Sequence, residues 1–311
     1  MSQARILSYD RAAIAEAAHL IAQGKPVAIP TETVYGLAAD ATRGDAVAAI
    51  YAAKGRPSFN PLIVHVNDVA AADAIAHLCD GARRLASAFW PGPLTIVAPM
   101  KAGAPIAALA TAGLSTIALR CPAHPAMRDL LRACGKPLAA PSANASGTIS
   151  PTRAEHVLRT LGHAIDLIVD AGPTTMGLES TIVAIGDDGL RLLRPGPITA
   201  RQLIDASGLP LSASLSGKIE APGQLTQHYA PSKPVRLDAT EAREGEWLIG
   251  FGAVGGVVSL SARGDTTEAA TRLFDLLHQA DMASAPRIAI APVPEDGLGA
   301  AINDRLRRAA A

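Results

Sequence analysis

Short apolar runs alternate with longer, alanine-rich segments over the first two thirds of the chain. The apolar runs predict strands at residues 27–30, 62–66, 94–98, 116–120 and 167–169. The alanine-rich segments between them have helical spacing and predict helices at about 11–23, 45–54, 70–78, 81–89 and 125–133. Because strands and helices interleave, the pattern predicts an α/β or mixed α+β domain.

Capping residues set the boundaries of two of these helices. Asp10 stands where it can cap the first helix, and Gly24 follows just past the end of that helix. Further along, Thr152 followed by Glu155 predicts a capping box, and therefore a helix that begins at Arg153.

A hairpin and one more helix close this first region. The polar residues Asp187–Gly189 lie between two apolar runs, 181–185 and 190–194, which is typical of two antiparallel strands joined by a tight turn. Thr199 with Gln202 then predicts a further capped helix.

The periodic pattern stops at residues 208–232, which are rich in Gly, Ser and Pro. So long a stretch is either a linker or a functional loop. Beyond it, strands are predicted at 247–251, 257–260 and 288–291 and helices at 266–282 and 298–309. We therefore divide the chain into a larger domain at 1–207, a linker or lid at 208–232 and a small α/β domain at 233–311.

Composition restricts the class of protein. The 28 Lys and Arg residues balance 28 Asp and Glu residues, with no long basic run, which argues against tight binding of nucleic acid. Three cysteines without CxxC spacing predict neither a disulfide framework nor a zinc site, and they favour a reducing compartment. The N-terminus lacks the apolar core of a signal peptide, and no apolar run reaches the roughly 18 residues of a membrane span. We expect a cytoplasmic protein without a membrane segment.

Four polar tracts stand at predicted loops, and each also has an ordinary structural explanation. Lys54 and Arg56 enter a proline-bracketed loop, where they act either as dipole partners of a helix end or as a phosphate clamp. The tract 140–150 has many hydroxyl and amide groups between small residues, so a ligand can approach its backbone closely. The other two tracts are 30–36, directly after a strand, and 177–181, followed by Arg194.

Common catalytic signatures are missing from the sequence. It contains no GxxxxGK[ST], no GxGxxG opening a helix in the first domain, no nucleophile elbow and no HExxH. His65 lies in an apolar strand, where a histidine is more often a core residue than a ligand.

Taken together, these tracts resemble the YrdC-like family, in particular its longer, two-domain threonylcarbamoyl-AMP synthases. The resemblance rests on five tracts in the first domain, at residues 30–37, 54–65, 89–95, 141–152 and 179–183. It continues in the linker, at 222–223 and 228–231, and in the second domain, at 260–265 and 295–299.

The resemblance implies a fold and a reaction. The fold is a twisted open sheet with a concave active-site face, followed by a smaller Rossmann-like α/β domain. The enzyme would be a nucleotidyltransferase that condenses L-threonine, bicarbonate and ATP to threonylcarbamoyl-AMP and releases pyrophosphate. Magnesium would be bound mainly through the ATP phosphates. The product would pass to a tRNA threonylcarbamoyl transferase, for threonylcarbamoyladenosine (t6A) at position 37 of ANN-decoding tRNAs, with a weak direct contact to tRNA left open.

The resemblance also implies site residues, and none of them is a metal ligand. The catalytic group would be Lys54, Arg56, Ser142 and Asn144. ATP would be held by Arg56, Asn60, Thr116, Ser142, Ser150, Arg194 and Tyr229. L-Threonine would be bound by Thr33, His65, Arg120, the backbone of Ala140 and Ser180. Glu32, inside the first tract, receives no role.

Two other functions stay open from the sequence. One is a module that binds tRNA or double-stranded RNA, against which the zero net charge argues. The other is a carbamoyl-adenylate enzyme with another acceptor, as in hydrogenase-maturation proteins, whose acylphosphatase and zinc-finger segments the sequence does not show. Oligomeric state, the route of bicarbonate capture and the role of the second domain are not predicted.

Overall fold

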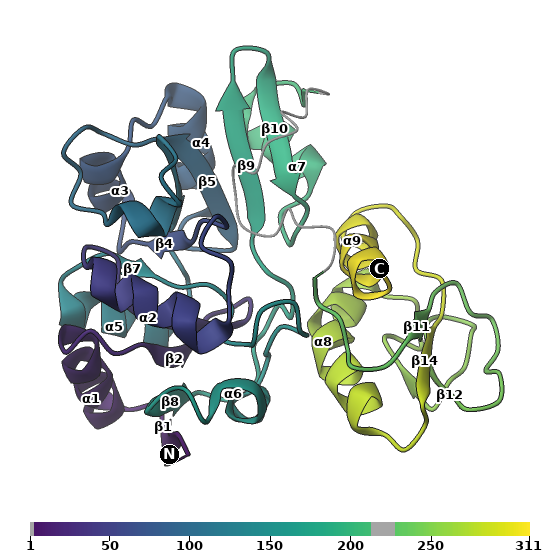
Figure 1. Cartoon of the computed structure of the whole chain (residues 1–311). Coiled ribbons are helices and arrows are strands. Elements are labelled where there is room, and N and C mark those ends of the chain that lie inside the picture. Colours follow the sequence, from purple (N-terminus) through teal and green to yellow (C-terminus); the bar gives the residue numbers. More distant parts are fainter. Residues whose placement is uncertain (1–2, 213–227) are drawn as a thin grey trace.

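The computed structural model describes residues 3–212 and 228–311. They form a larger and a smaller α/β part, and helices α8 and α9 of the smaller part face the larger one (Figure 1). The predicted fold class, a mixed α/β sheet with a second, smaller α/β unit, is confirmed. Residues 213–227 of the predicted linker lie outside the described residues.

A ten-stranded mixed sheet organises the larger part, in the order β1-β8-β2-β3-β7-β4-β6-β5-β9-β10. The strands are β1 (Arg5–Ser8), β2 (Val27–Pro30), β3 (Tyr35–Asp40), β4 (Ile63–His65), β5 (Leu94–Pro99), β6 (Thr116–Arg120), β7 (Leu138–Ala139), β8 (Leu167–Asp170), β9 (Thr181–Gly186) and β10 (Gly189–Arg194). The predicted hairpin is confirmed as the antiparallel pair β9 and β10. β4 and β6 run parallel, which places two predicted site residues, His65 and Arg120, directly opposite each other.

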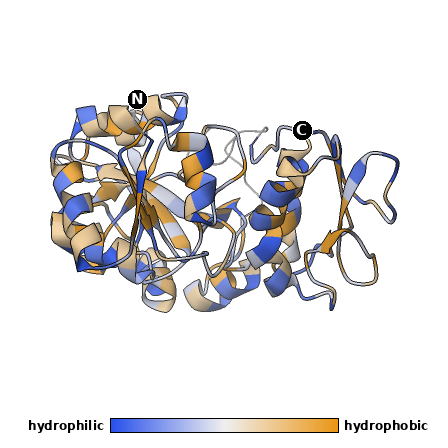
Figure 2. Ribbon diagram, turned by 90° about the horizontal axis from the view of Figure 1, so that it is seen from below, coloured by the Kyte–Doolittle hydropathy of each residue, from blue (hydrophilic) through white to orange (hydrophobic). Residues whose placement is uncertain are grey.

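Helices cover the sheet unequally. They are α1 (Arg11–Ala22), α2 (Gly44–Lys54), α3 (Val69–Ile75), α4 (Asp80–Phe89), α5 (Pro125–Cys134), α6 (Ala154–Leu161) and α7 (Ala200–Ser207), with a 3-10 turn at Ala108–Thr111. One face carries the main apolar core, while on the other α1 and α5 pack over the half of the sheet that contains β2 and β8. Apolar positions follow the strands, and polar ones lie on the outer helix surfaces (Figure 2). Near β4, β6 and β9 the second face carries only a small apolar cluster, and the pocket described below opens there.

Two local predictions are corrected. The helix predicted from Arg153 begins one residue later, and its N-cap makes no side-chain hydrogen bond. The expected capping box does not form, because Thr152 lies beside the ring of His156, whose Nδ1 accepts from the Thr152 backbone N–H at 3.3 Å. In addition, the tract after β2 is a turn that leads straight into β3, an unpredicted strand whose residues are all buried and therefore show no alternation.

The smaller part is built on a four-stranded parallel sheet in the order β11-β14-β12-β13. Its elements are β11 (Val235–Arg236), β12 (Glu246–Gly250), β13 (Val258–Ser259), α8 (Thr266–Met282), β14 (Arg287–Ile290) and α9 (Gly299–Ala309). α8 meets the larger part through an ion pair of 2.7 Å between Arg153 and Asp275 and a stack of the His156 and His278 rings with centroids 3.8 Å apart. Gly177 lies so close to α8 that a Cβ there would come within 2.4 Å of the Thr271 carbonyl oxygen.

None of the described helices is both long and apolar enough to cross a membrane.

Candidate active site

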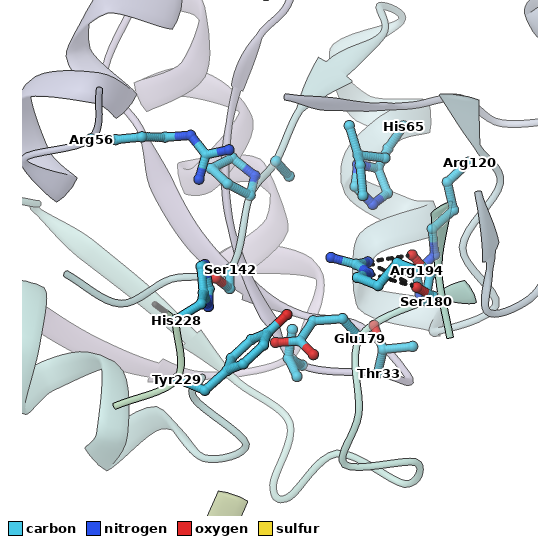
Figure 3. A pocket seen from close by; sticks show the side chains of 14 residues that line it. Thr33, Arg56, His65, Arg120, Ser142, Glu179, Ser180, Arg194, His228 and Tyr229 are labelled. Atoms are coloured by element: carbon cyan, nitrogen blue, oxygen red, sulfur yellow. Dashed lines mark hydrogen bonds between the residues drawn. The ribbon is translucent and has the colours of Figure 1, made fainter. Parts of the chain in front are cut away.

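A pocket opens on the partly covered face of the large sheet, against the start of the smaller part. It is lined by Thr33, Val34, Arg56, Ile63, His65, Arg120, Ala140, Pro141, Ser142, Glu179, Ser180, Arg194, His228 and Tyr229. Nine of the residues implied by the family resemblance are therefore brought together at one place. Figure 3 shows Arg56 and Ser142 on one side of the view and His65, Arg120, Ser180 and Thr33 on the other, with Glu179 and Tyr229 between them.

Strands β4 and β6 bring the His65 imidazole and the Arg120 guanidinium together at one side of the pocket. Arg120 is buried and forms an ion pair of 2.6 Å with Glu32, and its Nε donates to the Gly92 carbonyl oxygen at 3.3 Å. Burial and the neighbouring Arg120 charge lower the pKa of His65 to about 3, so its ring is neutral at pH 7. Neither of its ring nitrogens has a hydrogen-bond partner among the described residues. A buried imidazole that faces a pocket in this way is ready to bind a polar ligand.

The hydrogen bonds around Thr31 determine whether the Thr33 hydroxyl can donate or accept a hydrogen bond in the pocket. The Thr31 hydroxyl donates to the Val34 carbonyl oxygen at 2.7 Å, and a hydroxyl has a single proton to donate. The Thr33 hydroxyl, 2.8 Å from that of Thr31, must therefore be the donor of this pair. Thr33 thus offers only lone pairs to the pocket, which makes it an acceptor for a hydroxyl or an amine.

The pocket contains the half-buried guanidinium group of Arg56 and the buried one of Arg194. Arg56 donates to the carbonyl oxygens of Asn60 and Pro61 at 3.2 and 2.9 Å. Arg194 donates to the carbonyl oxygen of Ser180 at 3.0 and 2.9 Å and to its hydroxyl at 3.0 Å. Within residues 3–212 and 228–311, neither forms an ion pair with a carboxylate. Burial lowers the pKa of Arg56 to about 10 and also lowers that of Arg194. A guanidinium group without an ion-pair partner can bind an anion, so Arg56 and Arg194 are candidates for an anion site in this pocket.

Lys54 is directed into the protein and holds the loop after β7. Its Nζ donates to the Ser142 carbonyl oxygen at 2.6 Å and also to that of Asn144, while the Asn144 side-chain amide donates to the Thr148 carbonyl oxygen at 2.8 Å. Burial, together with the nearby Arg56 charge, holds the pKa of Lys54 well below its usual range. Lys54 and Asn144 do not line the pocket, but they fix the loop that presents Ser142 to it.

Three other implied residues are not part of the lining. Asn60 is buried behind Arg56, and its Oδ1 has no partner among the described groups. Thr116 begins the strand that Arg120 ends, at a half-buried position. Ser150 is buried, and its hydroxyl donates to Glu179.

Glu179 is a pocket residue that sequence reasoning missed, together with Val34, Ile63, Pro141 and His228. Its Oε2 accepts from Nε of Arg305, a fully buried residue of α9, at 3.1 Å. Burial alone raises the pKa of Glu179, but the Arg305 and Arg194 charges and the Ser150 hydrogen bond outweigh it and hold that pKa below its usual range. Glu179 belongs to a recognised tract, whereas nothing in the sequence indicates that its partner comes from the second domain.

Tyr229 closes the pocket from the linker side. Its backbone is in the left-handed region, at φ 66°, which is strained for a residue with a side chain. The ring lies close to two cations of α9, with the guanidinium carbons of Arg305 and Arg308 at 5.4 and 5.1 Å from its centroid. Its buried hydroxyl has no partner among the described residues. Tyr229 therefore lines the pocket with a hydroxyl that has no partner among the described residues.

The pocket offers little to a metal ion. Among the described residues there is no group of three or more His, Cys, Asp or Glu side chains that could hold one. The pocket's own carboxylate, Glu179, already accepts bonds from Ser150 and Arg305.

Three buried histidines and the half-buried His228 predict a marked loss of stability in mild acid. Burial lowers the pKa of His65, His156 and His228 to about 3 and that of His278 to about 4. Below the usual pKa of about 6.5 the unfolded chain binds protons that the folded protein excludes, so stability is complete above that pH and falls as the pH drops. We expect the unfolding free energy from urea titrations to be about 4–6 kcal/mol lower near pH 5.5 than near pH 7.5. A flat profile over that interval would contradict the neutral state of these rings.

Comparison with known proteins places both parts of the chain. Residues 19–196 match the Sua5, YciO and YrdC family, described as "Telomere recombination", and residues 198–311 match the family described as "Threonylcarbamoyl-AMP synthase, C-terminal domain". The chain is 40% identical to threonylcarbamoyl-AMP synthase of Bacillus subtilis over 98% of this chain and 94% of that protein. It is 38% identical to the synthase of Pyrococcus abyssi over 94% of this chain and 92% of that one.

A solved structure agrees with these matches. The crystal structure of P. abyssi Sua5 complexed with L-threonine superposes with a TM-score of 0.89 at 34% identity, covering 98% of this chain and 97% of that one. Escherichia coli YciO, at 21% identity and a TM-score of 0.54, shares the fold over 63% of this chain.

Fold, pocket and matches together define a two-part α/β enzyme with a buried site for small molecules. More particularly, the chain belongs to the Sua5, YciO and YrdC family, and its full-length relatives are enzymes named threonylcarbamoyl-AMP synthase.

Proposed function

We propose that this protein condenses L-threonine, bicarbonate and ATP to threonylcarbamoyl-AMP and releases pyrophosphate. One observation carries the proposal: the same pocket is lined by Thr33, His65 and Arg120 and by two further arginines, Arg56 and Arg194, that form no ion pair with a carboxylate among the described residues. The naming of full-length relatives as threonylcarbamoyl-AMP synthases and the threonine complex of the P. abyssi protein support the choice of substrate.

The amino-acid subsite suits threonine group by group. Arg120 has two N–H groups on Nη1 without a partner among the described residues, which suit the substrate carboxylate. Thr33 accepts a hydrogen bond from the amine or the hydroxyl. The rest of this subsite is formed by His65, Ser180 and the backbone of Ala140.

The reaction needs a new C–N bond and then a new P–O bond. Threonine's amine adds to the bicarbonate carbon, and loss of water leaves an N-carboxylate. An oxygen of that carboxylate attacks the α-phosphorus of ATP, and the bond from this phosphorus to the bridging oxygen of pyrophosphate breaks. Negative charge is redistributed over phosphate oxygens, so fixed cations at Arg56 and Arg194 lower the barrier by neutralising it.

The remaining implied residues position this machinery. Lys54 and Asn144 hold the loop of Ser142, Ser150 hydrogen-bonds Glu179, and Asn60 backs Arg56 and keeps a free Oδ1. We also assign Thr116 and Tyr229 to the nucleotide. Magnesium would arrive as the MgATP complex, since the described residues hold no ligand cluster for it, and it would neutralise phosphate charge when bound.

The product is a mixed anhydride that water destroys, so we propose that the linker around Tyr229 shields it. A transferase that loads the threonylcarbamoyl group onto tRNA, as in t6A formation, must then consume it.

The test is pyrophosphate release by the purified protein with ATP, magnesium and bicarbonate, with and without L-threonine. We expect release that depends on threonine and falls when bicarbonate is removed. Equal release without threonine would contradict the proposal. Binding of bare tRNA without ATP turnover would favour an RNA-binding module, and turnover with another acceptor would favour a different carbamoyl-adenylate enzyme.

The acceptor role of Thr33 makes a separate prediction. Thr33→Val keeps the shape but removes the acceptor, so we expect the KM for L-threonine to rise about tenfold, with the KM for ATP within about twofold of the parent value. Thr33→Ser is the matched control, because it keeps the hydroxyl, and it should stay close to the parent protein. Steady-state kinetics with each substrate varied in turn decides it, and an unchanged threonine KM in the valine variant would rule the role out.

A further inference from the structure

Glu32, in the turn between β2 and β3, takes no part in the function proposed above, yet its carboxylate is buried and fully engaged. Oε1 accepts a hydrogen bond of 2.6 Å from Arg120 Nη2. Oε2 accepts from the backbone N–H groups of Ala123 and His124, at 3.1 and 3.3 Å. The side chain therefore ties the first polar tract to the end of β6 and to the start of α5.

These bonds hold Arg120 in one direction. Its Nε donates to the Gly92 carbonyl oxygen and its Nη2 donates to Glu32, whereas Nη1 has no hydrogen-bond partner within the described residues. Arg120 lines the pocket, so the Nη1 side is the part of the guanidinium that a ligand can reach. Because the guanidinium is a rigid planar fork, fixing the Nε and Nη2 atoms fixes where Nη1 points.

The charges favour the same arrangement. Burial alone raises the pKa of Glu32, but the Arg120 charge and the hydrogen bonds from Arg120 and from backbone N–H groups outweigh it and hold that pKa below its usual range. Glu32 is therefore ionised at pH 7 and compensates Arg120 when the pocket is empty. The N–H groups at the start of α5 stabilise the Glu32 carboxylate when a second carboxylate, from the ligand, reaches the same guanidinium.

We propose that Glu32 is a positioning residue that aims Arg120 Nη1 at the carboxylate of the bound amino acid. The inference rests on the proposed function, because it takes the substrate to be an amino acid whose carboxylate binds Arg120. It predicts that loss of Glu32 weakens binding of the amino acid and leaves binding of the nucleotide unchanged.

Glu32→Gln tests this, since it keeps the size and one acceptor oxygen but removes the charge. We expect calorimetric titration to show the Kd for L-threonine raised about tenfold or more, with the Kd for ATP within about twofold of the parent value. Glu32→Asp, which keeps the charge on a shorter side chain, is expected to recover part of the threonine affinity. The matched control is Asp40→Asn, which removes another buried carboxylate paired with a cation, Lys136, away from the pocket lining. It should leave both affinities unchanged.

A ligand without a carboxylate separates positioning from general damage. L-Threoninamide has no carboxylate for Arg120 to bind, so Glu32→Gln should weaken its binding far less than that of L-threonine. Equal weakening of the two ligands, or a threonine affinity equal to that of the parent, would overturn the positioning role. If Glu32→Gln does not fold, the same comparison on Glu32→Asp decides, with a larger loss for threonine expected. Parent protein that neither binds threonine nor releases pyrophosphate would instead refute the proposed function itself.

Discussion

Replacing Arg56 by methionine is expected to lower threonine-dependent pyrophosphate release by about 10³-fold, the order of effect found when a charge-stabilising arginine is removed from phosphoryl transfer. The unfolding free energy should nevertheless stay within about 1 kcal/mol of the parent value, because relief from partly burying a charge that has no ion-pair partner offsets two lost hydrogen bonds to backbone carbonyls. Stopped turnover in a stable protein is the result that distinguishes an anion site from a structural arginine. Pyrophosphate assays and urea titrations on the same preparation measure both quantities.

Arg120→Met is the matched control for that experiment. It makes the same change at another pocket arginine, which is buried and has a carboxylate partner. Glu32 would be left as a buried charge without its cation, so we expect a loss of about 3–5 kcal/mol in unfolding free energy. If Arg56→Met destabilised the protein as much as Arg120→Met, the view that Arg56 lacks a counter-charge would be wrong.

Arg305→Met is expected to be the most damaging single change in the second domain. It removes the cation that faces Glu179 across the domain boundary and lies 5.4 Å from the Tyr229 ring. We expect a loss of about 3–5 kcal/mol in unfolding free energy and weaker ATP binding, since Glu179 also holds Ser150. Urea titration and calorimetry with a non-hydrolysable ATP analogue measure the two effects.

The double variant Glu179→Gln with Arg305→Met shows whether the pair itself is responsible. Removing both charges leaves no unpaired ion, so most of the stability lost in Arg305→Met should return. A double variant as unstable as Arg305→Met would mean that the arginine acts through its packing and not through Glu179.

The fold was predictable where the determinants are local. The Asp10 cap, whose side chain accepts from the Ala13 N–H, and the hairpin of β9 and β10 are encoded within a few neighbouring residues. β7 and β11 are two residues long and exist only because longer strands pair with them, so no local pattern indicates them. The Thr152 box failed because a nearby histidine ring, not the helix N-terminus, lies beside that residue.

The same distinction between local and distant determinants applies to the site. Several polar tracts meet in one pocket because they follow or end strands of a single sheet, and their residues were accessible from the resemblance. The resemblance did not indicate which charged residues pair with them. Glu32 is 88 residues from Arg120, and Glu179 is 126 residues from Arg305. Lys54 was expected at the phosphates, whereas its amine donates to loop carbonyls, a direction that spacing does not encode.

The most direct measurement is mass spectrometry of the reaction with ATP, magnesium, L-threonine and isotopically labelled bicarbonate. We predict an adenylate that contains threonine and carries the bicarbonate label, formed together with pyrophosphate and absent in the Arg56→Met variant. Release of AMP and pyrophosphate without this adduct, or an adduct that contains no label, would contradict the assignment of the pocket to threonylcarbamoyl-AMP synthesis.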